Sequence, residues 1–123
     1  PDLILSEHST WKRIYLHRMK HSEICIASTG LHQSSGWKIA EYLAAGRAIV
    51  SEPLCYEVPG PFQAGENYLT YTSADGCIEQ IRTLLARPEQ ILQMGQRNRA
   101  YYDEWLRPDQ IVTKALEQAK ILL

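Results

Sequence analysis

The chain has 123 residues, of which 45% are hydrophobic and 22% charged; this is enough for one ordinary domain and too hydrophobic for a disordered segment. No stretch approaches the ~18 consecutive apolar residues of a membrane span. Because 13 basic residues balance 14 acidic residues, to a net charge of −1, no overall field would attract nucleic acid or an anionic membrane, and a soluble globular chain is expected.

The chain begins with Pro1 rather than Met, and residues 1–5 lack the basic flank and long apolar core of a signal peptide. We therefore expect an excised fragment or a processed product. Cys25, Cys55 and Cys77 are an odd number without a C-x-x-C pair, which argues against a zinc site or a disulfide framework. This usage fits a reducing compartment, so we expect the cytoplasm, with the periphery of a membrane as the alternative for the full-length protein.

The N-terminal part predicts one helix followed by one buried strand. A helix capped by Ser6 or Ser9 would turn an apolar stripe toward a core, formed by Trp11, Ile14, Tyr15 and Met19. Basic residues occupy much of the rest of this helix and indicate a solvated face, with a nucleic-acid patch as the alternative: Lys12, Arg13, Arg18 and Lys20. The continuous apolar run 24–27 is typical of a strand buried on both faces of a parallel sheet.

A polar loop, 28–35, separates this strand from a second predicted helix at 36–45. The inward positions of the helix would be Trp37, Ala40, Leu43 and Ala44, and Gly46 would end it in the left-handed conformation. The next buried strand is expected at 48–51. Strand, helix and strand then form one βαβ unit, whose crossover should be right-handed.

The rest of the chain predicts a third strand and three further helices. Prolines and glycines between 52 and 66 indicate a long ordered loop, and a strand follows at 68–71. Ser73 would cap the next helix, and Pro88 and Pro108 would each begin another.

This order of elements places the chain in the α/β class. Three strands interleaved with helices predict a three-layer, Rossmann-like parallel sheet flanked by helices. Doubly wound domains usually have five or six strands, and residues 3–5 add at best a stub. We therefore expect the sheet to be truncated at its N-terminal side.

The two long loops, 28–35 and 52–66, both follow strand carboxyl ends, where open α/β sheets bind their ligands. The helix that opens at Gly36 offers unpaired N–H groups and a positive dipole end to a phosphate. Lys38 adds a positive charge, and Glu41, one turn further on the same side, could accept hydrogen bonds from a diol. A ligand with a phosphate and hydroxyls fits this pair; a plain surface ion pair is the alternative.

Other kinds of site receive less support. His32 is either a ligand contact or acid–base group, or a solvent-exposed loop residue. Cys55 and His32 could form a nucleophile dyad, but nothing supplies an orienting third residue. Neither G-x-x-x-x-G-K-[ST] nor G-x-G-x-x-G occurs, and the strand ends lack the aspartates of a phosphorylation receiver.

The segment Gly36–Val50 contains a Lys, a Glu three residues on, a run of small residues, a Gly and an apolar strand. It resembles the donor-site helix and following strand of nucleotide-sugar glycosyltransferases of the group 1 type, which have the two-domain GT-B fold. The resemblance covers about residues 10–120 and also includes these pieces: Ser22–Ile26, Gly65–Leu69, the helix after Ser73, and Arg99–Tyr102.

The resemblance implies that Glu41 binds the ribose hydroxyls of the donor nucleotide and that Lys38 lies near the diphosphate, where it would stabilise the leaving group. It also implies that the preceding loop lies near the sugar and the phosphates, through Gly30, His32, Gln33, Ser34, Ser35 and Gly36. Retaining members often carry a Glu eight positions before Glu41, where this chain has Gln33. A neutral amide cannot carry the negative charge or act as a base, so this mode of donor stabilisation is in question.

On this resemblance, residues 1–123 are one partial C-terminal nucleotide-sugar-binding domain, helical in 88–123. The expected partners are the donor, the missing N-terminal acceptor domain and a second copy at the exposed sheet edge; no cofactor, metal or nucleic acid is implied. The intact protein would transfer a glycosyl group from a nucleoside diphosphate sugar to an acceptor hydroxyl, whereas the fragment alone would be inactive. The alternative is a non-catalytic, glycosyltransferase-like interaction or nucleotide-binding module.

Overall fold

The computed structural model describes residues 6–122, apart from the side chains of Ser9 and Thr10. Three parallel strands form one sheet in the order β1-β2-β3, with Cys25 opposite Ile49 and Val50 opposite Leu69. The strands are β1 (Ile24–Ala27), β2 (Ala48–Ser51) and β3 (Leu69–Thr70), and the α-helices are α1 (Lys12–Lys20), α2 (Gly36–Ala44), α3 (Ala74–Leu85), α4 (Pro88–Tyr101) and α5 (Pro108–Leu122). Three shorter turns complete the described chain: η1 (Glu7–Thr10), η2 (Leu31–Gln33) and the π-helical turn η3 (Tyr102–Leu106).

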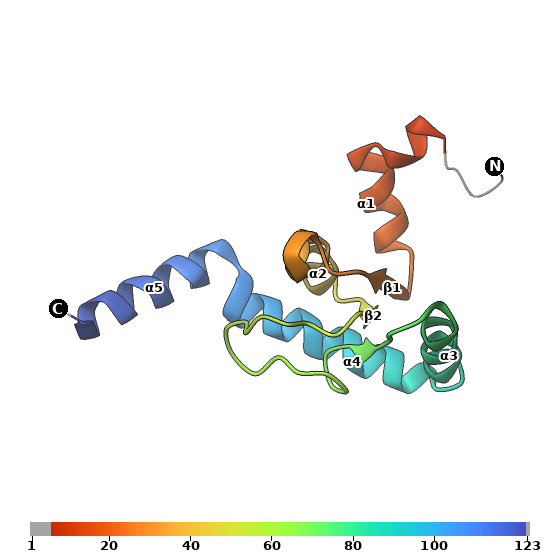
Figure 1. The fold of residues 1–123 in the computed structure, drawn as a ribbon. Helices are drawn as coiled ribbons and strands as arrows, with labels where there is room; N and C mark the ends of the chain where they lie inside the picture. Colours follow the sequence, from red (N-terminus) through yellow and green to blue (C-terminus); the bar gives the residue numbers. More distant parts are fainter. Residues whose placement is uncertain (1–5, 123) are drawn as a thin grey trace.

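Helices cover both faces of the sheet, with α1 and α2 on one side and α3 and α4 on the other (Figure 1). Alternate side chains of each strand point to opposite faces. Cys25, Ala27 and Ile49 therefore pack in one core cluster with α1, α2 and the last residue of α4, Tyr101, whereas Ala48 and Val50 pack in a second cluster with α3 and the earlier part of α4. This arrangement confirms the predicted α/β, Rossmann-like fold; the stub expected at residues 3–5 lies outside the described residues.

The central strand β2 is buried along its whole length, as predicted. The prediction that β1 is buried on both faces was wrong, because Ile26 is 47% exposed. In the described part of the chain β1 lies at the edge of the sheet, and the helices on the Ile26 side, α3 and α4, pack against β2 and β3. Half of one face of β1 therefore remains open.

The helix α2 ends as the sequence predicts, at a left-handed Gly46 with φ of +66°. The N–H of Gly46 bonds to the carbonyl of Leu43, and the N–H of Arg47 bonds to the carbonyl of Tyr42, each at 3.0 Å. Its predicted inward face was wrong in part, because Trp37 is 78% exposed. Leu43 is buried as predicted, and Ile39 and Tyr42 point into the core with it, at the same helical spacing.

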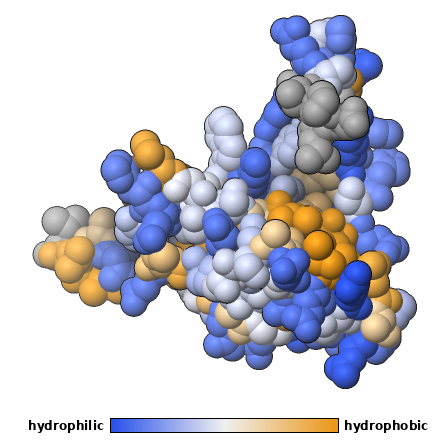
Figure 2. Space-filling model, turned by 45° about the vertical axis from the view of Figure 1, so that its right-hand side comes forward, coloured by the Kyte–Doolittle hydropathy of each residue, from blue (hydrophilic) through white to orange (hydrophobic). Residues whose placement is uncertain are grey.

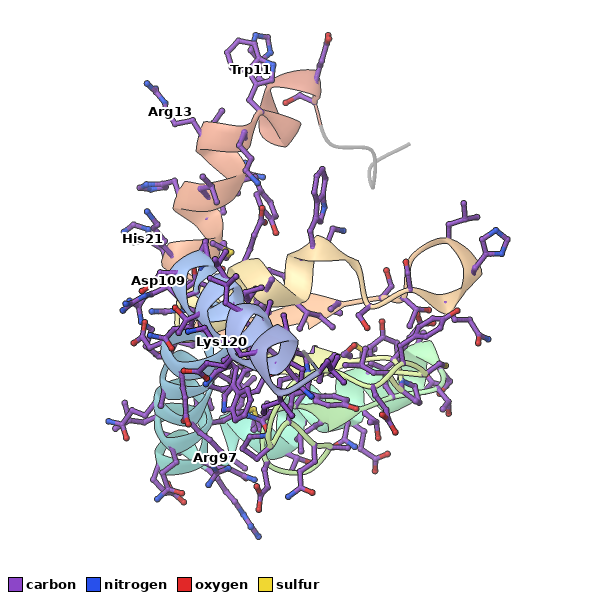
Figure 3. The ribbon with its side chains drawn as sticks, turned by 90° about the vertical axis from the view of Figure 1, so that its left-hand side faces the viewer. Trp11, Arg13, His21, Arg97, Asp109 and Lys120 are labelled. Carbon is purple, nitrogen blue, oxygen red and sulfur yellow. The ribbon has the colours of Figure 1, made fainter. Side chains whose placement is uncertain are left out.

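The helix α1 begins at Lys12 with Trp11 as its N-cap residue and no side-chain cap. The prediction that Ser6 or Ser9 caps this helix was wrong, because the short helix η1 precedes α1 and Trp11 is the N-cap residue. Met19 is buried as predicted, whereas Trp11 is 56% exposed rather than part of the core stripe. Figure 3 shows Trp11 and Arg13 at the outer end of α1, pointing away from the body of the molecule.

The C-terminal helices begin where the sequence predicts. The hydroxyl of Ser73 accepts a 3.0 Å hydrogen bond from the N–H of Gly76 and caps α3. Pro88 starts α4 and Pro108 starts α5. No residue of α5 is buried, and the helix projects from the body with hydrophobic side chains at its outer end (Figures 1 and 2). None of the helices within residues 6–122 is long and apolar enough to cross a membrane.

A buried pair of amides joins α4 to the segments that lead into β2 and β3. Asn98 is fully buried, and its Nδ2 donates to the carbonyl oxygens of Arg47 at 2.8 Å and Asn67 at 2.9 Å. Its Oδ1 accepts from Nδ2 of Asn67 at 3.2 Å, and Oδ1 of Asn67 accepts from the backbone N–H of Gln63. Every bond in this network joins segments that are far apart or separated by a turn, so the amides set where the two strands begin.

We expect Asn98→Ala to lower the free energy of unfolding by about 3 kcal/mol, because it leaves buried donors and acceptors without partners. Urea denaturation followed by circular dichroism measures the change. Gln96→Ala, at an exposed position of the same helix, is the control and should stay within about 0.5 kcal/mol of the wild type. Equal midpoints for the two variants would contradict the structural role of the amide pair.

Candidate functional site

Two pockets contain residues that could bind a ligand: one lies between two helices, and the other lies at the edge of the sheet where the carboxyl ends of the three parallel strands meet. The first, called the Glu41 pocket, lies between α1 and α2 and has a volume of about 210 Å³. It is lined by Lys12, Tyr15, Trp37, Lys38 and Glu41. The second, called the Glu52 pocket, has about 270 Å³ and is lined by Thr29, Gln33, Glu52, Pro53, Cys55, Tyr71 and Thr72.

The N-terminus of α2 is open to a ligand. Ser35 is the N-cap residue, but its side chain makes no capping hydrogen bond to the first turn. Gly36 has φ of +68°, and the space where a Cβ would stand is empty. The first N–H groups of a helix have no partner within the helix and form its positive end. Backbone donors are therefore accessible at this point without a side chain in front of them.

Glu41 forms an ion pair in the Glu41 pocket, but its partner is Lys12 of α1 and not Lys38. The side chain of Glu41 is only 22% exposed, whereas that of Lys12 is 63% exposed. The ammonium of Lys12 also lies 5.5 Å from the ring centre of Tyr15 and 5.8 Å from that of Trp37. Since one partner is largely in solvent, the pair contributes at most about 1 kcal/mol and a ligand can displace it.

The phenol of Tyr15 lies in the same pocket, beside the side chains of Glu41 and Tyr42. Its oxygen is buried and makes no hydrogen bond within normal geometric limits. Burial raises the pKa of Tyr15 well above its usual range, and the nearby Glu41 carboxylate raises that pKa further. The group therefore stays protonated at neutral pH and can donate to a ligand oxygen.

The loop before α2 holds two successive residues, His32 and Gln33, in the left-handed region, with φ of 54° and 61°. This conformation is costly for residues other than glycine and is found most often at functional sites. The hydroxyl of Tyr56 donates to the carbonyl of His32 at 3.1 Å, and the N–H of Gly30 donates to the carbonyl of Ser34 at 2.8 Å. The turn is thus closed on itself and anchored by the loop that follows β2.

In the Glu52 pocket, both hydrogen bonds made by the side chain of Glu52 involve the same oxygen. Its Oε2 accepts from the backbone N–H of Thr29 at 2.7 Å and from the Thr29 hydroxyl at 2.9 Å. The backbone hydrogen bond lowers the pKa of Glu52, and the hydroxyl lowers it further. The carboxylate is therefore ionised at neutral pH. The hydroxyl of Tyr71, beyond β3, donates to the carbonyl of Ala27 at 3.0 Å and ties the two outer strands together at this pocket.

The structure brings some of the sequence-predicted residues together and separates others. Lys38 and Glu41 share the Glu41 pocket, whereas Gln33 lines the Glu52 pocket. Ser35 and Gly36 line a third hollow of about 160 Å³, beside Leu54 and Phe62 among others. The remaining three, Gly30, His32 and Ser34, build the turn through their backbone.

The Cys55–His32 dyad gains no support. Cys55 is exposed in the Glu52 pocket, where its thiol lies 3.9 Å from the carbonyl of Pro53. His32 is not among the residues that line this pocket. All three cysteines are free thiols.

Among the residues of the two pockets that sequence reasoning did not single out are Lys12, Tyr15, Trp37 and Glu52. Trp37 lies four positions before Glu41, so a helical wheel centred on Glu41 would have placed both on the same face. Glu52 follows a predicted strand directly, which marks it as a residue of the binding edge. Nothing in the local pattern singles out Lys12 or Tyr15, because their place depends on how α1 docks against α2.

A further pocket of about 370 Å³ lies near the amino end of β2, away from the loops. Its two arginines already bind backbone: Arg47 donates to the carbonyl of Ala45, and Arg99 donates to the carbonyl of Ala44. We interpret this pocket as part of the C-terminal cap of α2. Within residues 6–122, no three His, Cys, Asp or Glu side chains gather as a metal site would require.

We expect Trp37→Ala to change the free energy of unfolding by less than about 0.5 kcal/mol, because the indole is exposed at the rim of the Glu41 pocket. Leu43→Ala on the same helix removes a fully buried side chain and should cost about 2–5 kcal/mol. Thermal or urea unfolding of the two variants checks this. A large loss with Trp37→Ala would mean that the indole belongs to the core, as the sequence suggested.

The chain is similar to a known protein family over most of its length. A family described as glycosyl transferase-like matches residues 5–117, a range that includes every residue of the two pockets. No curated protein and no solved structure matches the chain. Since the family match spans nearly the whole chain, the chain belongs to the glycosyl transferase-like family, as its resemblance to glycosyltransferases of the GT-B fold predicts.

Proposed function

We propose that this glycosyltransferase-like domain binds the nucleoside diphosphate of a nucleotide-sugar donor at the Glu41 pocket and the N-terminus of α2. The observation that carries the proposal is that Lys38 and Glu41 line one pocket beside an uncapped helix terminus. A carboxylate accepts two hydrogen bonds from a ribose diol, and an ammonium with free backbone N–H groups suits a diphosphate. Family membership supports the same assignment.

The pocket has room for part of a nucleotide. Its volume of about 210 Å³ is below the ~300–1,000 Å³ of sites that enclose a whole drug-sized ligand. In the proposed complex the ribose replaces Lys12 at Glu41, and the phenol of Tyr15 donates to a ribose oxygen. The exposed indole of Trp37 offers an aromatic face at the rim, suited to stacking with a base.

Catalysis by such a site rests on leaving-group stabilisation. When a glycosyl group leaves the donor for an acceptor hydroxyl, negative charge develops on the diphosphate. Lys38 and the N–H groups at the start of α2 would be pre-oriented toward that charge, which is the most effective form of electrostatic stabilisation. The acceptor hydroxyl would be held by another part of the full-length protein.

A second candidate is a non-catalytic module that binds the nucleotide without transferring the sugar. Gln33 favours it, because the amide in the Glu52 pocket can neither carry negative charge nor act as a base. The two candidates share the nucleotide site and differ in turnover. Sugar transfer by the full-length protein that is lost in Lys38→Ala would exclude the non-catalytic module.

Calorimetric titration of the full-length protein with UDP, GDP and ADP tests the donor site. We expect one of them to bind and Glu41→Ala to weaken that binding by about tenfold or more, the effect of losing a charge-assisted hydrogen bond. Lys38→Ala should weaken it through the phosphates. Lys12→Ala should strengthen it or leave it unchanged, because Lys12 competes for Glu41.

Glu79→Ala and Lys20→Ala are matched controls, since both residues are exposed and line neither pocket. Their affinities should equal that of the wild type. The proposal fails if none of the three nucleotides binds, or if Glu41→Ala binds as tightly as its control.

A further inference from the structure

We propose that Glu52 binds the hydroxyl groups of the donor's sugar and thereby determines which sugar the domain accepts. This role rests on the proposed donor site, because the sugar reaches the Glu52 pocket only when the nucleotide occupies the Glu41 pocket. It concerns a residue on a different loop, in a separate hollow of about 270 Å³.

The Glu52 pocket lies where all three strands end. Thr29 follows β1, Glu52 follows β2, and Tyr71 and Thr72 follow β3. Gln33 joins them from the turn that leads into α2, the helix that carries Lys38 and Glu41. A ligand whose phosphates lie at the start of α2 therefore has this pocket beside it, along the same edge of the sheet.

Thr29 holds the side chain of Glu52 in place, and one carboxylate oxygen of Glu52 is left to accept a hydrogen bond from a ligand. Thr29 binds Oε2 with two donors, and none of the described residues donates to Oε1. The carboxylate is charged at neutral pH, and these donors lower its pKa, so the charge persists into more acidic conditions. A pre-oriented carboxylate oxygen is a strong acceptor for a hydroxyl group.

The lining of the pocket selects a polyol over other ligands. No lysine or arginine lines it, and the Glu52 charge repels a phosphate. A single carboxylate is too few for Ca²⁺, which takes six to eight oxygen ligands. The remaining groups are neutral donors and acceptors that suit hydroxyls: the amide of Gln33 and the hydroxyls of Thr29, Tyr71 and Thr72.

The strained turn gives a physical reason for the place of Gln33. Two successive left-handed residues cost free energy, yet the turn is closed by Gly30 and Ser34 and anchored by Tyr56. The result is that Gln33 lines the same hollow as Glu52. A neutral partner beside Glu52 also avoids the repulsion that a second carboxylate would add there.

The test compares nucleotides with and without a sugar in the full-length protein. UDP, GDP and ADP are titrated beside UDP-glucose, UDP-galactose, GDP-mannose and ADP-glucose. In the wild type, one sugar nucleotide should bind more tightly than its own diphosphate. Glu52→Gln should lower the affinity for the sugar nucleotide about tenfold relative to that for its diphosphate, and it should leave the diphosphate affinity unchanged. The amide oxygen can still accept from Thr29, so a purely structural role would leave both affinities unchanged.

Cys55 supplies a second readout, because its exposed thiol lines the same pocket. The preferred sugar nucleotide should protect Cys55 from alkylation by N-ethylmaleimide, measured by mass spectrometry, more than its diphosphate does. Glu57→Gln, an exposed residue of the same loop that does not line the Glu52 pocket, is the control and should behave as the wild type.

The outcomes separate the two proposals. One outcome overturns this inference and leaves the donor site standing. In it, the diphosphate binds through Glu41, but Glu52→Gln changes neither the affinity for the sugar nucleotide relative to its diphosphate nor the protection of Cys55. If no nucleotide binds the wild type, the donor site fails and this inference fails with it. If the sugar nucleotide no longer binds more tightly than its diphosphate in Glu52→Gln but still does so in Glu57→Gln, the result supports the role of Glu52 in binding the sugar.

Discussion

The buried amide of Asn98 is the interaction on which the binding edge depends. It joins α4 to Arg47, just before β2, and to Asn67, just before β3, with no exposure to solvent. Because it fixes where two neighbouring parallel strands begin, it also fixes where they end. The loops that follow them, with Glu52 on one and Tyr71 on the other, are therefore held in register. A polar network this deeply buried specifies one arrangement, since any other leaves its donors and acceptors unpaired.

The two pockets differ in charge, because side chains of both signs line the Glu41 pocket whereas Glu52 is the charged residue of the Glu52 pocket. The Glu41 pocket contains the ammonium of Lys38 and the carboxylate of Glu41, near the uncapped start of α2, which suits a ligand that has both phosphates and hydroxyls. The Glu52 pocket contains a single ionised carboxylate among neutral polar groups, which suits hydroxyls alone. Gln33 belongs to the turn that connects them. A nucleoside diphosphate sugar has the same order of groups, with the diphosphate between two polyols.

The errors of sequence prediction have a common physical cause. Trp37 and Leu43 both fit the spacing of an apolar face on a helix. Spacing alone does not decide which of two adjacent faces of the helix packs against the core. The structure buries Ile39, Tyr42 and Leu43 and leaves Trp37 in solvent at the rim of a pocket. Ile26 was expected to be buried because its strand is continuously apolar, yet burial also depends on which helices reach that strand.

The sequence by itself determined the order and type of the elements, the parallel α/β class, and the placement of Lys38 and Glu41 on one side of a helix. These features follow from short-range rules: side-chain periodicity, the Ser73 cap, the prolines at the starts of α4 and α5, and the left-handed Gly46. Only the tertiary structure decided that Lys12 pairs with Glu41, 29 residues away, and that Thr29 holds Glu52, 23 residues away. Such contacts depend on how whole elements dock, and no local pattern contains that information.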